Sequence, residues 1–129
     1  MCGGVRYEIG EAPIGASYCH CTRCQRRTGT AASISARLAP GSLRILQGKE
    51  LLRSWQPDDG NPKVFCSVCG SQLWAEDRSQ PGALFVRFGT FDEDPGIRPA
   101  FRQFVDYAAA WEPIPDDGLP RYPERRPPA

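Results

Sequence analysis

The stretch Cys19-His20-Cys21-Thr22-Arg23-Cys24 brings three thiols into six residues, and Cys66-Ser67-Val68-Cys69-Gly70 brings two more. With two residues between thiols, the backbone can fold back so that both sulfurs reach one ion at about 2.3 Å. Gly70 permits the tight turn that this requires. No βαβ pattern surrounds either motif, and a cytosolic chain disfavours disulfides, so the spacing predicts metal ligands rather than disulfides or a redox pair.

The first cysteine stretch is consistent with two kinds of metal site. In an extended segment, Cys19 and Cys21 lie on one side, and Cys24 returns on the next turn. Three thiolates leave a fourth position for water or substrate, as in catalytic zinc sites. Alternatively, Cys2 or His20 completes a closed structural site, and spacing alone leaves both possibilities open. His20 is the single histidine, and we expect its side chain to point away from the two flanking thiols.

Two arginines directly follow this stretch. Arg26 and Arg27 are candidate substrate-binding residues, because a guanidinium can hold a carboxylate or lower the pKa of a thiol. A solvated helical face explains the same pattern. Trp55 is a candidate for the core or for a pocket wall.

Composition limits the function classes. The chain has 129 residues and a formal net charge of +1, so it lacks the charge that would favour nucleic acid or an anionic membrane as a partner. No apolar run approaches the roughly 18 residues of a spanning helix. No signal-peptide pattern follows Met1, so we expect a cytoplasmic protein. Oligomeric state is not predicted.

The alternation of apolar and polar residues predicts a single, mainly β domain over residues 1–112, mostly antiparallel and with little helix. Glycine and proline, 13 of each, favour short strands and many turns. One helical turn should follow the first cysteine stretch and end at Gly29. A proline-rich tail, residues 113–129, should be extended over the body or partly disordered. The expected strands are residues 5–9, 31–38, 43–46, 51–55, 63–65, 71–76 and 84–88, with a last one in 101–107.

Several segments occur in an order that resembles one known family. They are residues 2–7, 18–29 and 65–71, then Val86-x-Phe88-Gly89-Thr90, Phe104-Val105-Asp106, Trp111-x-x-Ile114 and Leu119-Pro120. Together they resemble the glutathione-dependent formaldehyde-activating enzyme family, which also includes centromere protein V. The resemblance runs from Cys2 to about Glu124.

The resemblance implies a β-tent fold, antiparallel sheets around zinc-binding knuckles, with one or two zinc ions per chain. It assigns Cys2, Cys66 and Cys69 to a structural zinc site. It assigns Cys19, Cys21 and Cys24 to a catalytic zinc with an open position. The implied activity is that of a carbon–sulfur lyase acting on a small thiol such as glutathione and an aldehyde such as formaldehyde, giving an S-hydroxymethyl adduct. The alternative is a non-catalytic interaction module with two structural zinc sites.

The chain departs from the family pattern at two places. The family has a C-x-C motif near its N-terminus, and only the second of those cysteines, Cys2, is present. An upstream start, water, another side chain or the α-amine would then supply the fourth ligand. The family also often has a His-Ile pair where this chain has Arg102-Gln103.

Overall fold

The computed structural model describes residues 1–128, and these form a mainly β protein with two sheets and one short α-helix. Ala129, the last residue of the predicted tail, lies outside the described residues. The strands are β1 (Arg6–Ile9), β2 (Gly15–Cys19), β3 (Ser33–Leu38), β4 (Leu43–Gln47), β5 (Leu52–Trp55), β6 (Lys63–Cys66), β7 (Gln72–Glu76), β8 (Leu84–Arg87) and β9 (Arg102–Gln103). The helix is α1 (Thr22–Thr28), and the 3-10 turns are η1 (Lys49–Leu51), η2 (Phe88–Thr90) and η3 (Val105–Tyr107).

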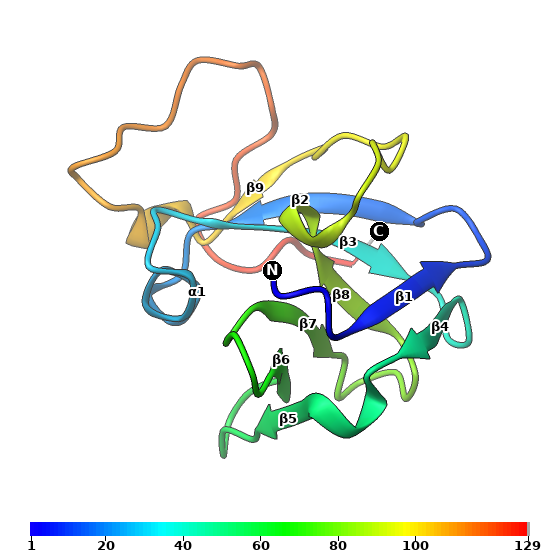
Figure 1. Ribbon diagram of the computed structural model, residues 1–129. Helices are drawn as coiled ribbons and strands as arrows, with labels where there is room; N and C mark the ends of the chain where they lie inside the picture. The colour runs from blue at the N-terminus through cyan, green and yellow to red at the C-terminus, as the bar shows by residue number, and fades with distance from the viewer. Residues whose placement is uncertain (129) are drawn as a thin grey trace.

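Seven strands form one sheet in the order β5-β6-β7-β8-β3-β2-β9, and β1 pairs with β4 in a separate ribbon. Every pairing is antiparallel except that of β2 with β9. Figure 1 shows β1 and β4 beside the sheet, whereas α1 lies at its opposite end. The predicted mainly β fold, with little helix, is therefore confirmed.

Two local expectations were wrong. Strand β2 was not predicted, because Gly15-Ala16-Ser17 offers too little apolar alternation to signal a strand. The expected strand in residues 101–107 is limited to Arg102–Gln103, after which the chain turns into η3. Phe104 has a φ of 57°, a left-handed conformation that ends an extended segment.

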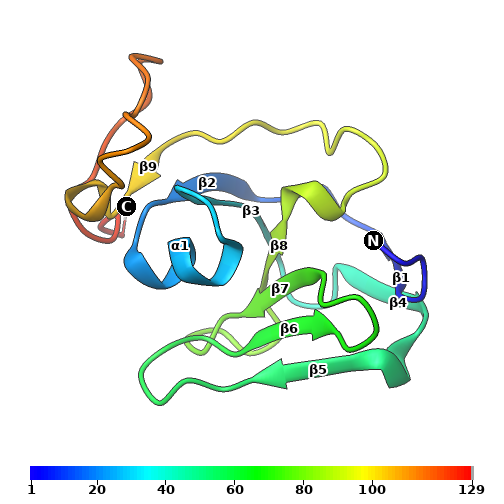
Figure 2. The ribbon, with the colours of Figure 1, turned by 60° about the vertical axis from the view of Figure 1, so that its left-hand side comes forward.

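The two faces of the large sheet differ in chemistry. Val64, Trp74 and Val86 lie on one face and form the apolar core with Leu38, against which Tyr7 and other side chains of the β1–β4 ribbon pack. Lys63 and Arg87 alternate with these core residues, so their side chains point to the other face. Helix α1 covers that second face, as Figure 2 shows.

Local signals at both ends define α1. At its N-terminus, Cys21 is the cap, and its sulfur accepts a hydrogen bond from the backbone N–H of Cys24 at 3.3 Å. At its C-terminus, Gly29 is left-handed with a φ of 67°, and its N–H donates to the carbonyl of Gln25 at 2.8 Å. The helical turn expected to follow the Cys19–Cys24 stretch is thus present. None of the described helices is long and apolar enough to cross a membrane.

The proline-rich segment lies along β9 in the described residues. Arg102 donates its backbone N–H to Pro120 at 2.9 Å, and its carbonyl accepts from Tyr122 at the same distance. Arg102 also forms an ion pair with Asp117 at 2.8 Å. The segment is extended and proline-rich, so it gains order from these contacts rather than from structure of its own. The domain boundary at residue 112 stays a prediction.

We predict that adding a methyl group at Gly48 strongly destabilises the folded protein. Its φ is 83°, and a Cβ would lie 2.1 Å from the carbonyl oxygen of Gly4 and 2.9 Å from the Cα of Val5. Because these are backbone atoms, the ribbon itself would have to move. We expect Gly48→Ala to lower the free energy of unfolding by about 1–3 kcal/mol beyond the conformational cost.

Gly41→Ala is the matched control for that substitution. Gly41 has a φ of 80°, and a Cβ there would meet nothing within 4 Å. Urea denaturation of both variants separates the backbone strain from the steric clash. Equal losses in the two variants would show that the close approach of Gly48 to Gly4 is unimportant.

Candidate metal centre

The first cysteine cluster comprises Cys2, Cys66 and Cys69. Their sulfurs lie within 4.8 Å of one another, and those of Cys2 and Cys66 are 3.8 Å apart. The C-x-x-C segment forms a knuckle in which the N–H of Gly70 donates to the carbonyl of Cys66 at 2.8 Å. Gly70 is left-handed, with a φ of 75°. Sulfurs bound tetrahedrally at about 2.3 Å from one ion are roughly 3.8 Å apart, so the thiols fit zinc.

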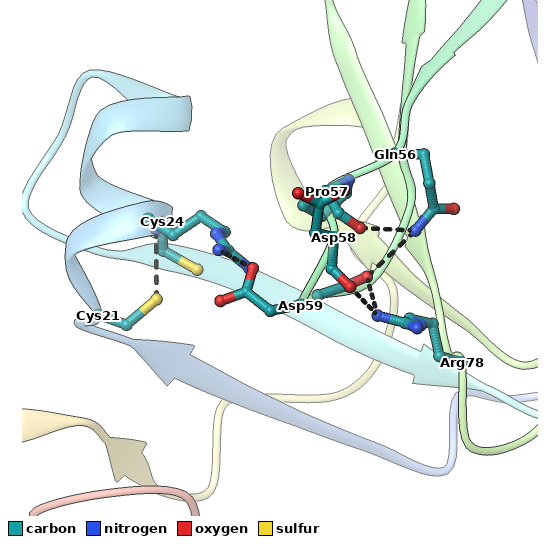
Figure 3. A network of polar contacts seen from close by, with 9 residues as sticks. Cys21, Cys24, Gln56, Pro57, Asp58, Asp59 and Arg78 are labelled. Atoms are coloured by element: carbon teal, nitrogen blue, oxygen red, sulfur yellow. Dashed lines mark hydrogen bonds and ion pairs between the residues drawn. The ribbon is translucent and has the colours of Figure 1, made fainter.

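The second cluster comprises Cys19, Cys21 and Cys24, whose sulfurs also lie within 4.8 Å of one another. The end of β2 supplies Cys19, and the first turn of α1 supplies Cys24. Figure 3 shows the side chains of Cys21 and Cys24 turned toward each other. Three soft sulfur donors from one short segment fit zinc.

Each cluster is a set of three donors. Within residues 1–128, no fourth histidine, cysteine or carboxylate joins either group, and no cysteine is in a disulfide. His20 is outside both groups. These geometries confirm two three-cysteine groups that could hold metal, while the assignment of one as structural and the other as catalytic stays a prediction.

Hydrogen bonding among the thiols of the second cluster gives them different pKa values. Cys19 and Cys21 donate to Cys24 and lower its pKa to about 2, assisted by the hydroxyl of Ser33 and the charge of Arg87. Hydrogen bonds with Cys21 and with Cys24, together with burial, raise the pKa of Cys19. These contacts therefore favour the thiolate at Cys24 and the protonated thiol at Cys19.

The first cluster is more exposed to solvent. Cys66 is buried, with 2% of its surface exposed, whereas Cys2 is exposed. Backbone N–H donors from Ser71 and Cys2 lower the pKa of Cys69 to about 6. The first cluster thus joins the N-terminus to the end of β6 by side chains 64 residues apart in the chain.

A hollow of about 560 Å³ lies beside α1. Its lining residues are Thr22, Arg23, Arg26, Arg27 and Trp55. The two predicted substrate-binding arginines both line it, Arg26 exposed to solvent and Arg27 half-buried. Trp55 is 53% exposed, which makes it a wall of the hollow rather than a core residue.

The loop between β5 and β6 lies against α1 next to the second cluster. Arg23 forms an ion pair with Asp59 at 2.6 Å, linking the first turn of α1 to the loop between β5 and β6. Arg78 donates to the carbonyls of Asp58 and Gly60, both at 3.2 Å. Figure 3 shows Asp59 reaching toward the helix that carries Cys24. The loop is therefore held from both sides next to the second cluster.

His20 has a structural environment distinct from that of the thiols that flank it. It is 4% exposed, and its Nε2 accepts a hydrogen bond from Arg102 at 3.2 Å. Burial and the charge of Arg102 lower the pKa of His20. The Arg102 guanidinium lies over the Tyr18 ring, 3.8 Å from its centroid, and also binds Asp117. Arg102, where the family often has histidine, thus joins His20 to the C-terminal segment.

Sequence reasoning missed two cations near the second cluster, Lys63 and Arg87. The pKa of Lys63, which burial lowers, also responds to the charge of Cys24. Burial lowers the pKa of Arg87 too, and all three thiols of the second cluster act on it. Strand alternation could have placed both side chains on one sheet face, but nothing in the sequence shows that α1 covers that face.

The fold and the two groups define a class of protein: a small β protein with two three-cysteine groups suited to metal. The sequence model of the glutathione-dependent formaldehyde-activating enzyme family matches residues 1–107. The chain belongs to this family, and its sheets and cysteine groups agree with the family's β-tent fold. A crystal structure of a Rhodobacter sphaeroides protein is similar, with 25% identity, a TM-score of 0.58 and coverage of 94% of each chain.

Proposed function

We propose that the chain is a zinc-dependent carbon–sulfur lyase of its family's type. It would combine a glutathione-like thiol with formaldehyde or a similar small aldehyde, or cleave the adduct. The observation that carries this proposal is the second cluster, three thiols with no fourth donor among residues 1–128, beside a hollow that a substrate could enter. Family membership supports it.

The reaction joins a thiol sulfur to the aldehyde carbon. The S–H bond breaks, a C–S bond forms, and the carbonyl oxygen takes up the proton. Zinc, when bound, lowers the pKa of a coordinated substrate thiol so that a thiolate is present at neutral pH. Cys19, Cys21 and Cys24 would hold that ion and leave one position free for the substrate.

The surrounding residues would position the substrate and the cluster. Arg26 and Arg27 line the hollow, where their guanidinium groups can orient a carboxylate. Hydrogen bonds from Cys19 and Cys21, with smaller contributions from the hydroxyl of Ser33 and the charge of Arg87, lower the pKa of Cys24 and so favour the thiolate that binds a cation. Cys2, Cys66 and Cys69 would hold a second, structural zinc.

The alternative is an interaction module in which both sites only support the fold. Exposed Trp111, 68% accessible, and the tail arginines favour such a surface. In that case neither thiol nor aldehyde would react faster in the presence of the protein.

Exchange NMR of glutathione with formaldehyde tests the proposed function. We expect the exchange rate between free thiol and S-hydroxymethyl adduct to rise in proportion to the concentration of zinc-loaded protein. Free zinc at the same concentration and protein treated with a chelator are the controls. A rate that equals the free-zinc control at every protein concentration would refute the lyase and favour the interaction module.

A further inference from the structure

The sheet face beneath α1 carries an unusual set of cations. Lys63 on β6 lies directly opposite Trp55 on β5, so both side chains share this face, and Trp55 lines the hollow beside α1. Arg87 on β8 lies opposite Ser35 on β3. Arg27 reaches this region from the helix and donates to the carbonyl of Val64 at 3.2 Å. Three elements thus place three cations between the helix and the sheet.

These three cations have no carboxylate partner among residues 1–128. Lys63 is only 8% exposed and makes no side-chain hydrogen bond or ion pair in that part of the chain. Arg87 donates to the hydroxyl of Ser35 at 2.6 Å, yet its Nε is buried without a partner. The Nε of Arg27 is likewise buried and unpartnered. Buried charges are normally paired, so this arrangement calls for an explanation.

Neighbouring arginines show that the fold does supply carboxylates where it needs them. Arg37, on the same face of the sheet as Arg87, pairs with Asp77 at 2.8 Å. Arg23 on α1 pairs with Asp59 at 2.6 Å. The other cations that lack a carboxylate partner in the described residues are exposed, whereas Lys63 is buried and Arg27 and Arg87 are half-buried.

The thiols of the second cluster do not balance this charge. Three thiolates and one divalent zinc ion leave a net charge of −1. Arg27, Lys63 and Arg87 contribute +3, so the local sum is +2. Neutralising the zinc-loaded cluster therefore uses only one of the three positive charges. The other two are available to bind an anion.

We propose that Lys63, Arg87 and Arg27 form an anion subsite beside the second cluster, which receives a carboxylate of the substrate. The hollow lined by Arg27 and Trp55 is the entry. A carboxylate there would supply the missing acceptor for the buried nitrogens and hold the substrate's thiol close to Cys19, Cys21 and Cys24. The inference rests on the proposed function and adds Lys63 and Arg87 as residues that hold the substrate's carboxylate.

Calorimetry with a thiol-free probe tests the subsite separately from catalysis. The probe is the tripeptide γ-glutamyl-2-aminobutyryl-glycine, which keeps both carboxylates of glutathione but has a methyl group in place of the thiol. We expect it to bind the zinc-loaded full chain and to be displaced by sulfate. Lys63→Met should weaken binding about tenfold or more through the loss of a charged contact, and Arg87→Gln should have a similar effect.

A second readout distinguishes the subsite from a structural role. Because Lys63 is buried and unpaired, Lys63→Met should raise the melting temperature of the unliganded protein while it weakens probe binding. Lys49→Met, at an exposed lysine of η1, is the matched control and should change neither. Zinc content should be the same in Lys63→Met, the control and the wild type.

Two results would overturn the subsite. One is unchanged probe affinity in both Lys63→Met and Arg87→Gln. The other is no probe binding by the wild type together with zinc loss in both variants, which would make the cations counter-charges to the thiolates alone. Since the probe cannot react, its binding can persist when the lyase assay fails. Conversely, a measurable lyase rate combined with probe binding that does not depend on Lys63 would refute the subsite but leave the proposed function intact.

Discussion

Replacing Cys66 by serine is expected to remove one of two zinc ions per chain and to lower the melting temperature by about 10 °C or more. Cys66 is 2% exposed, belongs to the apolar core cluster and lies 3.8 Å from the sulfur of Cys2. Serine is a poor zinc ligand, and structural zinc contributes directly to folding free energy. A loss of about 3 kcal/mol corresponds to roughly 10 °C in a domain of this size.

Ser67→Ala is the matched control for Cys66→Ser. Ser67 is exposed, and its backbone N–H, which the substitution retains, donates to Leu51. Elemental analysis and calorimetric melting of both variants give the stoichiometry and the stability together. Two zinc ions and an unchanged melting temperature in Cys66→Ser would show that the first cluster does not hold a structural metal.

Cys21→Ser is expected to remove the other zinc ion and to reduce the lyase rate to that of free solution, while most of the stability remains. Cys21 supplies one of three sulfurs and also caps α1, where its sulfur accepts from Cys24 at 3.3 Å. Serine can replace the cap, because a hydroxyl oxygen also accepts from the helix N–H groups. The substitution therefore affects metal binding much more than helix formation.

Zinc stoichiometry, circular dichroism and exchange NMR on the same Cys21→Ser sample measure these three effects. Ser17→Ala, on the strand that leads into the cluster, is the control and should retain two zinc ions and the wild-type rate. If Cys21→Ser kept both zinc ions and accelerated the thiol–aldehyde reaction as the wild type does, the second cluster would not be the catalytic centre. Compared with each other, the Cys66→Ser and Cys21→Ser variants assign a separate role to each cluster.

The sequence determined the local features of this protein. Cysteine spacing predicted the group of Cys19, Cys21 and Cys24 and the Cys66–Cys69 half of the other group, because a C-x-x-C or C-x-C-x-x-C segment brings its own sulfurs together through local backbone geometry. Strand alternation predicted most of the sheet, and Gly29 marked the end of α1. The contact of Cys2 with Cys66 across 64 residues was expected only from the family resemblance.

Only the tertiary structure showed what surrounds the second cluster. Lys63 and Arg87 are far apart in sequence and resemble ordinary exposed charges of alternating strands. Lys63 becomes buried and Arg87 half-buried, both without a carboxylate partner, because β6 and β8 share a sheet whose second face is covered by α1. Similarly, Arg102 meets His20 only because β9 pairs in parallel with β2. Long-range pairing decides which charges are removed from water, and short-range patterns carry no record of that pairing.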